Sequence, residues 1–147
     1  MKLKKGFTLI EYIVVIAIIG ILSATVVAAS SNFVPSLKLN GSAKNLQSHL
    51  RQAQEEAITQ QKQYVIRFDL ASSPPKYQLI KIDGGETIVR TINLPQNITV
   101  SLSSDITDNQ IAFSPDGGPS SSGDITITAG EKTKVITISP AGVIKLP

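Results

Sequence analysis

The chain has 147 residues, 41% of them hydrophobic and 17% charged, with no cysteine and a formal net charge of +3. This length fits one domain with one additional segment, and the lack of cysteine excludes disulfide bonds and thiolate chemistry. Three of the basic residues lie among the first five, and the remaining eleven balance the eleven acidic ones. The sequence therefore predicts no strong electrostatic attraction to nucleic acid.

An uncharged apolar run follows the basic N-terminus. From Tyr12 to Ala29 no residue is charged. A helix needs about 20 mainly apolar residues to cross the hydrocarbon core of a bilayer, and basic flanking residues stay on the cytoplasmic side. The stretch from Phe7 to about Ala29 thus predicts a membrane-spanning helix, with the N-terminus inside the cell and the rest of the chain outside.

Glu11 is an acidic residue at the edge of this apolar run. A carboxylate costs roughly 2.5 kcal/mol or more at the centre of a membrane helix, less near the interface, and usually marks function. One interpretation is that its side chain only reaches the lipid headgroups. The other is that cleavage between Gly6 and Phe7 creates a protonated amine four residues before Glu11. Glu11 then offsets this charge within one chain or across to a neighbouring chain.

An ordinary secretory signal is the alternative interpretation of the N-terminus. Such signals combine a basic region, an apolar region and small residues at the cleavage site, and residues 26–28 (Val-Val-Ala) fit that last description. This alternative would leave a soluble, secreted, β-rich domain. The position of Glu11 and the length of the apolar run argue against it.

Residues 32–63 predict a second, amphipathic half of the helix. Pro35 lacks a backbone donor and disfavours helix at the preceding residue, so we expect a kink or break there. Apolar residues then recur at helical spacing. This stripe consists of Ala43, Leu46, Leu50, Ala53 and Ala57, with Ile58 beside it. We expect it to face a sheet, which the small Ala53 and Ala57 allow to approach closely.

From residue 64 onwards the apolar residues alternate with a period of two, which predicts strands. The expected strands are Tyr64–Leu70, Tyr77–Ile82, Glu86–Leu94, Ile98–Leu102, Ile111–Phe113, Asp124–Ala129, Lys132–Ser139 and an edge strand within Gly142–Leu146. Residues 83–85 and 130–131 predict hairpin turns, and residues 115–123 predict a loop. A helix followed by strands indicates the α+β class.

The N-terminal motif resembles that of type IV pilins and type II secretion pseudopilins. It reads G-F-T-L-I-E at 6–11 and V-V-I-A-I-I-G-I-L at 14–22. In that family a prepilin peptidase cuts after the glycine and methylates the new N-terminal phenylalanine, and the glutamate pairs with the amine of an adjacent subunit. The resemblance assigns cleavage and N-methylation to Gly6 and Phe7, and the assembly salt bridge to Glu11. Tyr12 departs from the more usual aliphatic residue.

Two further motifs resemble those of H-type minor pseudopilins and T-type minor pilins. They are Leu-Arg-x-Ala-x-x-x-Ala at 50–57 and Ser-Pro-x-Gly at 139–142. The resemblance implies a pilin-like fold, in which a helix with a transmembrane half and an amphipathic half packs on a C-terminal antiparallel β-sheet domain. The expected division is a prepilin leader (1–6), a transmembrane and polymerisation helix (7–31), an amphipathic half (32–63) and a β-sheet domain (64–147).

The resemblance also implies a function. We expect a minor subunit that assembles into, or at the tip of, a type II secretion pseudopilus or type IV pilus. Expected partners are other pilin or pseudopilin subunits, the prepilin peptidase, the inner-membrane assembly platform and membrane lipid. The expected location is the inner membrane, crossed once, with the C-terminal domain outside the cytoplasm, and then the filament. We expect neither enzyme activity nor a cofactor.

Catalytic and metal-binding residues receive weak support. His49 is the only histidine, and no serine or acid is marked as its partner, so we expect a structural role. The larger major pseudopilins bind calcium in a C-terminal loop, and Asp116 and Asp124 flank a Gly-Ser-rich loop here. Calcium needs six to eight oxygen ligands, so we expect no metal site and name these two as weak candidates.

DNA binding is the other alternative function. Some T-type relatives are implicated in DNA uptake through a basic tail of the form Gly-Arg-x-Arg. This chain instead reads Gly-Val-Ile-Lys at 142–145, so Lys145 is a weak candidate for a phosphate contact. Affinity for phosphates scales with the number of charges neutralised, so we expect DNA to be an improbable partner.

Overall fold

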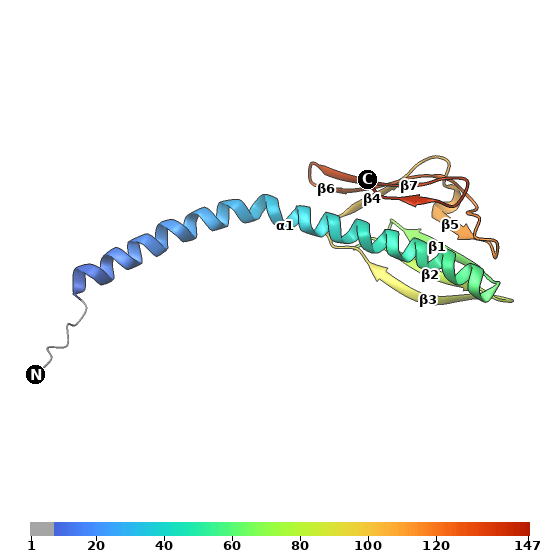
Figure 1. The fold of residues 1–147 in the computed structure, drawn as a ribbon, viewed down its shortest axis with the longest axis horizontal. Coiled ribbons are helices and arrows are strands. Elements are labelled where there is room, and N and C mark those ends of the chain that lie inside the picture. The colour runs from blue at the N-terminus through green and yellow to red at the C-terminus, as the bar shows by residue number, and fades with distance from the viewer. Residues whose placement is uncertain (1–7) are drawn as a thin grey trace, which may run out of the picture. The chain divides into compact units, whose positions relative to one another are not determined.

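The structure is a computed structural model that describes residues 8–147, without the side chains of residues 25–32. In this part of the chain one long helix, α1 (Leu9–Gln60), precedes all the strands. The strands are β1 (Gln63–Asp69), β2 (Lys76–Ile82), β3 (Glu86–Asn93), β4 (Thr99–Leu102), β5 (Gln110–Phe113), β6 (Gly123–Ala129), β7 (Lys132–Ile138) and β8 (Ile144–Lys145), with a 3-10 turn, η1 (Thr107–Asn109), before β5. This order confirms the predicted α+β class (Figure 1).

The chain divides into two compact units, Met1–Val34 and Pro35–Pro147. In the first unit every side chain from residue 8 to residue 24 is exposed. Among the residues that the structure describes, no helix is long and apolar enough to cross a membrane. The predicted leader (1–6), Phe7 and the side chains of residues 25–31 lie outside the described residues. The membrane-spanning segment therefore stays a prediction.

Pro35 does not end the helix. The backbone of α1 is helical from Leu9 to Gln60 with Pro35 inside it, so of the expected kink or break, the break is wrong. A proline inside a helix removes one N–H and thus one backbone hydrogen bond. The residues that follow carry the buried stripe, and tertiary packing of an amphipathic face supplies most of the stability of a helix in a protein.

The predicted apolar stripe of α1 forms the centre of the core. Its five members, Ala43, Leu46, Leu50, Ala53 and Ala57, are all 0% exposed, whereas the adjoining Ile58 is 46% exposed. They belong to one cluster of buried side chains to which both sheets contribute. The sequence thus predicted correctly which face of the second half of α1 is buried.

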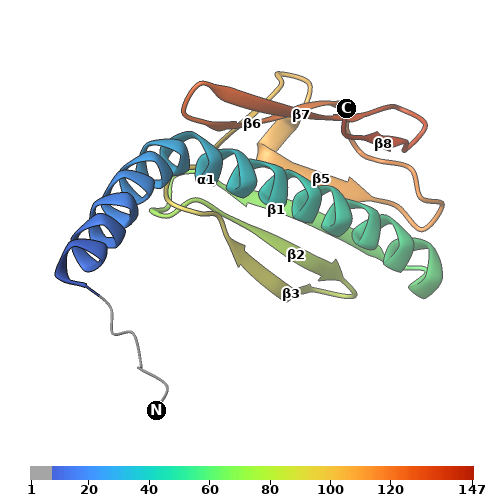
Figure 2. The same ribbon diagram turned by 60° about the vertical axis from the view of Figure 1, so that its left-hand side comes forward.

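The strands form two antiparallel sheets, with the orders β3-β2-β1-β5 and β4-β6-β7-β8. Within the second unit, α1 passes along the first sheet and the strands β6, β7 and β8 lie beside it (Figure 2). The two predicted hairpins are present, with Ile82 paired to Glu86 and Ala129 paired to Lys132. All strand pairings in the described part of the chain are antiparallel, as predicted.

Strand β1 is buried on both faces, which its alternating sequence did not predict. Val65, on the face away from the main core, forms a small cluster with its cross-strand partners Ile80 and Ala112. Arg67 donates two hydrogen bonds to Glu86, of 2.7 and 2.9 Å. Because β2 lies between these two strands, the ion pair links β1 to β3 across β2.

Candidate functional site

The N-terminus of α1 is capped by a threonine. The backbone N–H of Glu11 donates to the carbonyl oxygen of Thr8 at 3.2 Å and to its Oγ1 at 3.4 Å. Thr8 and Glu11 have the Thr-x-x-Glu spacing of a capping box, in which the first residue accepts from the N–H of the fourth. Our sequence analysis missed this cap, although the spacing before an apolar run signals it. The cap places Glu11 in the first turn of the helix.

The carboxylate of Glu11 is available for a partner outside the described chain. Its side chain is exposed, and no described residue forms a hydrogen bond or ion pair with the carboxylate. Glu11 lines a hollow of about 350 Å³ together with the side chains of Tyr12, Val15, Ile16 and Ile19. A carboxylate beside an apolar hollow has the chemistry to accept a cationic group that arrives with an apolar side chain.

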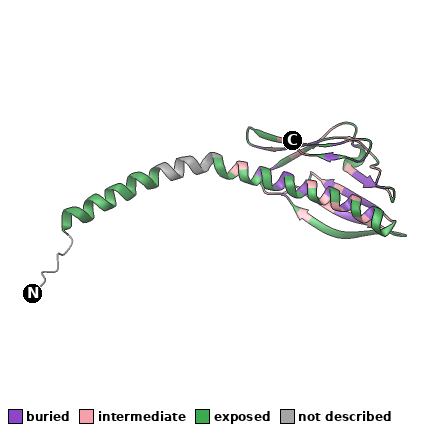
Figure 3. Cartoon of the chain, in the orientation of Figure 1, coloured by how far each residue is buried: buried purple, intermediate pink, exposed green. Residues whose placement is uncertain are grey.

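The surface around Glu11 is almost entirely apolar. The large apolar side chains of residues 9–22 are about half or more exposed, from 48% at Val15 to 78% at Leu9. Figure 3 shows this part of α1 exposed, in contrast to the mixed colours of its second half. Soluble monomers rarely expose continuous apolar patches larger than a few hundred Å², and larger ones mark protein or membrane contacts.

The other two residues of the predicted site cannot be placed beside Glu11. Gly6 and Phe7, to which cleavage and N-methylation were assigned, lie outside the described residues. Their roles therefore stay predictions from the sequence.

Polar side chains of α1 hold the C-terminal segment, a role that sequence reasoning missed. Gln54 Nε2 donates to the carbonyl oxygens of Gly117 at 2.8 Å and Gly142 at 3.0 Å. Arg51 Nη2 donates to the carbonyl oxygen of Ile144 at 3.0 Å, with Gln47 Nε2 near the same atom at 3.4 Å. These bonds join the two motifs at 50–57 and 139–142. They attach the C-terminal segment to α1 in a chain that has no cysteine to form a disulfide bond.

Gly142 is required by this arrangement. Its φ is +78°, a conformation that favours glycine. A Cβ atom there would lie 2.6 Å from Gln54 Nε2 and 3.0 Å from the carbonyl oxygen of Gly117. The glycine of the Ser-Pro-x-Gly motif therefore allows three segments to approach closely: α1 at Gln54, the turn at Gly117 and the C-terminal segment at Gly142.

His49 is hydrogen-bonded on both ring nitrogens. Nε2 lies 3.4 Å from Arg90 Nη1, and Nδ1 lies 2.7 Å from the Tyr77 hydroxyl. Arginine can only donate, so Nε2 accepts and a neutral ring donates from Nδ1 to Tyr77. Burial, and secondly the charge of Arg90, lower the pKa of His49 below its ordinary value of 6.5. Its partners are thus a phenol and a guanidinium rather than the serine and carboxylate of a catalytic triad.

The two weak metal candidates lie in separate local networks. Asp116 Oδ1 accepts from the N–H of Gly118 in its own turn at 3.3 Å. Asp124 Oδ1 accepts from Thr137 Oγ1 across the β6–β7 pair at 2.7 Å. Within the described part of the chain, no three His, Cys, Asp or Glu side chains are grouped so that they could hold a metal ion.

Lys145, the weak candidate for a DNA contact, lies on β8, two strands away from the acidic Asp124 on β6. It pairs with Thr137, which pairs in turn with Asp124. Residues directly opposite each other in a sheet share a face, so this row carries one positive and one negative charge. Such a row gives little support for a phosphate-binding surface.

Comparison with known families gives two matches. Residues 42–142, more than half of the chain, match the family described as "Type II transport protein GspH". Residues 1–27 match the "Prokaryotic N-terminal methylation motif", which contains Gly6, Phe7 and Glu11. No curated protein matches the sequence significantly.

Solved structures have the same fold. The type IV minor pilin FimU of Pseudomonas aeruginosa PAO1 has a TM-score of 0.65 at 20% sequence identity, and the match covers 78% of this chain and 92% of FimU. The minor pseudopilin EpsH from the type 2 secretion system of Vibrio cholerae has a TM-score of 0.65 at 14% identity, covering 75% of this chain and 96% of EpsH. With a GspH domain that spans most of its length and an N-terminal methylation motif before it, the chain belongs to the GspH family of type II transport proteins, the minor pseudopilins.

Proposed function

We propose that this minor pseudopilin is anchored in the inner membrane by its N-terminal segment and enters a filament through the surface around Glu11. In this proposal a prepilin peptidase cuts between Gly6 and Phe7 and methylates Phe7. The mature N-terminal amine of one subunit then pairs with Glu11 of an adjacent one. The observation that carries the proposal is the exposed carboxylate of Glu11, which has no partner among the described residues.

The hollow beside Glu11 supports this pairing. Phe7 would bring an aromatic side chain and an amine together, and the hollow offers apolar side chains next to a carboxylate. A protonated amine has a reference pKa near 8, so it would be largely charged at neutral pH. Pairing in an environment without bulk water strengthens the attraction between the two charges.

The apolar surface of residues 9–22 supports both membrane anchoring and assembly. Before assembly, lipid would cover these side chains, and the basic residues before Gly6 would keep the N-terminus in the cytoplasm. In a filament, the same side chains of neighbouring subunits would cover each other. The partners that this function needs are other pseudopilin subunits, the prepilin peptidase, the assembly platform of the inner membrane and lipid.

The test replaces Glu11 and follows processing, membrane insertion and assembly separately. We expect Glu11→Ala to be cleaved before Phe7 and to fractionate with the membrane, because neither step needs the pairing. Its recovery in the filament fraction should fall about tenfold or more, which corresponds to the loss of one ion pair of about 1.4 kcal/mol. Mass spectrometry of the N-terminus and immunoblots of the membrane and filament fractions measure these three quantities.

Two variants separate charge from shape. Glu11→Gln keeps the size of the side chain and should assemble as poorly as Glu11→Ala, whereas Glu11→Asp should retain part of the assembly. Tyr12→Leu, which also lines the hollow, is the control and should assemble normally. Normal filament recovery of Glu11→Gln would exclude the pairing, and a mature chain that begins at Ala29 would favour an ordinary signal.

A further inference from the structure

The open edges of the two sheets differ in length and protection. Over residues 8–147 the edge strands are β3, β5, β4 and β8. The edge of β5 is covered, because the N–H of Ser120 donates to the carbonyl oxygen of Ala112 at 2.7 Å and the N–H of Ala112 donates to Ser120 Oγ at 3.0 Å. Strands β4 and β8 have four and two residues, whereas β3 has eight. Strand β3 is thus the long edge without such a cover.

The backbone groups at this edge can be assigned from the hydrogen bonds of β3. The N–H of Leu94 donates to the carbonyl oxygen of Pro75 at 2.8 Å. Opposed residues of an antiparallel pair alternate between hydrogen-bonded and non-hydrogen-bonded positions. Leu94 therefore occupies a hydrogen-bonded position opposite Pro75. Counting back along β3, Asn93 and Thr91, which are opposite Lys76 and Gln78, occupy non-hydrogen-bonded positions. Their N–H and C=O groups point away from β2, towards the open edge.

The side chains of β3 make this edge apolar at one point. Seven of its eight residues are exposed, including Ile88 at 57% and Val89 at 47%. The register of β2 and β3 shifts between Leu79 and Ile80, next to these two residues. Natural proteins usually protect long edges with charges, prolines or short strands, because an exposed apolar edge pairs with other chains.

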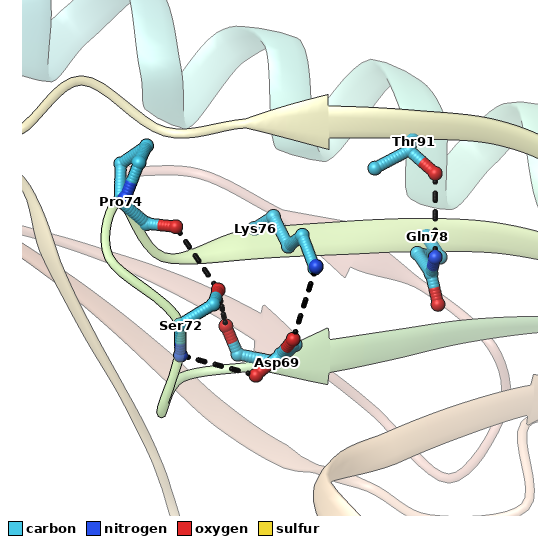
Figure 4. Close-up of polar contacts among 6 residues, drawn as sticks. All are labelled: Asp69, Ser72, Pro74, Lys76, Gln78 and Thr91. Atoms are coloured by element: carbon cyan, nitrogen blue, oxygen red, sulfur yellow. Dashed lines mark hydrogen bonds and ion pairs between the residues drawn. The ribbon is translucent and has the colours of Figure 1, made fainter.

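The charges around β3 leave one basic residue without a counter-ion. Glu86 is paired with Arg67, and Lys76 with Asp69 at 3.3 Å. Figure 4 shows Lys76 directed at Asp69 and Gln78 at Thr91, across the same face. Arg90 contacts the neutral ring of His49, and no carboxylate within the described residues forms an ion pair with it. Arg90, which lies opposite the buried Leu79, thus places beside this edge a positive charge without a counter-ion among the described residues, on the side of the sheet that α1 covers.

We propose that the open edge of β3 binds an extended strand from the globular domain of another subunit, with apolar side chains near Ile88 and Val89 and a carboxylate near Arg90. Main-chain hydrogen bonds to Thr91 and Asn93 would give affinity, and Arg90 would select an acidic strand. This inference rests on the proposed function for the identity of its partner as another subunit. It adds a second contact, on the globular domain, to the pairing at Glu11.

The test uses a proline at the open edge. Thr91→Pro removes an N–H that β2 does not use, and proline is tolerated on edge strands where its nitrogen faces outward. The full chain in its membrane should fold normally, but its recovery in the filament fraction should fall about tenfold. Thr91→Val is the matched control. It loses the 3.3 Å side-chain bond from Gln78 but keeps the N–H, and should assemble like the unmodified chain.

Charge reversal tests the proposed acidity of the partner. Arg90→Glu should lower recovery in the filament fraction about tenfold, as Thr91→Pro does. Arg90→Lys keeps the charge and should be recovered within about twofold of the unmodified chain. Equal recovery of Arg90→Glu and Arg90→Lys would overturn the choice of an acidic strand.

Hydrogen exchange tests the edge in the unmodified chain, so that misfolding of a variant cannot explain the result. The amides of Thr91 and Asn93 should exchange rapidly in the detergent-extracted subunit and at least tenfold more slowly in the filament. Rapid exchange in both, or normal assembly of Thr91→Pro, would overturn the proposal. Either result leaves the pairing at Glu11 intact, whereas normal assembly of Glu11→Gln would remove that pairing and leave the edge of β3 unaffected.

Discussion

The two halves of α1 belong to one helix but have opposite relations to the rest of the chain. The side chains of residues 8–24 are all exposed, although nearly all are apolar. Between Ala43 and Ala57 the same helix buries a complete stripe against both sheets. Burying apolar area stabilises a fold by roughly 25 cal/mol per Å². The second half obtains this stabilisation within the chain, whereas the first half, in the function proposed above, would obtain it from lipid or from other subunits.

The difference extends to the polar residues. In the second half Arg51 and Gln54 donate to backbone carbonyls of the C-terminal segment. In the first half the carboxylate of Glu11 has no partner among the described residues. A hydrogen bond within the chain stabilises the fold, whereas an unpaired carboxylate on an apolar surface is available for assembly. The contacts of the second half stabilise the fold, and assembly through the first half is the role proposed for it above.

The largest effect expected from this contrast is the loss in the free energy of unfolding when a core side chain of α1 is shortened. Leu50→Ala should lower the free energy of unfolding by about 2–5 kcal/mol, because it removes a fully buried side chain and leaves a cavity. Ile16→Ala changes a side chain that is 62% exposed and should change that free energy by less than about 0.5 kcal/mol. Urea unfolding of the detergent-held chain, followed by circular dichroism, measures both. Similar losses in the two variants would contradict the division of roles.

A smaller effect is expected at the C-terminal glycine. Gly142→Ala should lower the free energy of unfolding by about 2 kcal/mol, since it combines strain at positive φ with displacement of Gln54. Gly84 is the matched control, because its φ is also positive, at +70°, but a Cβ there would meet nothing within 4 Å. Gly84→Ala should therefore cost only the backbone strain, about 1 kcal/mol. Equal costs for both, from the same unfolding measurement, would remove the steric part of the argument.

Gln54 tests the polar contacts of the second half alone. Gln54→Ala removes two hydrogen bonds to carbonyl oxygens and should lower the free energy of unfolding by about 1 kcal/mol. We also expect faster release of C-terminal residues by a carboxypeptidase, since the segment at 139–147 loses one of its attachments. Gln52→Ala, which removes a bond within α1 to Glu56, is the control and should leave the C-terminus protected. A rate of release equal to that of the unmodified chain would show that β8 is held by other contacts.

The smallest effect is the pH dependence from His49. The pKa of His49 is lowered in the folded state, by burial first and by Arg90 second, so the unfolded chain binds the proton more readily. The free energy of unfolding should therefore decrease as the pH falls below the ordinary value of 6.5 and level off below the folded-state pKa. His49→Gln should reduce this slope between about pH 7.5 and pH 5. An unchanged slope in urea midpoints would assign the pH dependence to other groups.

Much of the fold could be predicted from local patterns. The stripe from Ala43 to Ala57 follows from helical spacing, and the eight strands and two hairpins follow from alternation and turn residues. A break at Pro35 was not predicted correctly, because a local rule about one N–H does not include the packing of the turns that follow it. The N-terminal cap formed by Thr8 was missed although the Thr-x-x-Glu spacing is visible in the sequence.

The amino-acid sequence by itself determined the class of the protein, the position of Glu11 beside an apolar run, and the face of α1 that is buried. These features depend on short-range spacing along the chain. The tertiary structure decided which residues far apart in sequence meet: Gln54 with Gly117 and Gly142, His49 with Tyr77 and Arg90, and Arg67 with Glu86 across β2. It also decided that, among the described residues, β3 is the long edge strand without a partner. Sheet order and register depend on contacts between distant residues, and periodicity alone does not specify them.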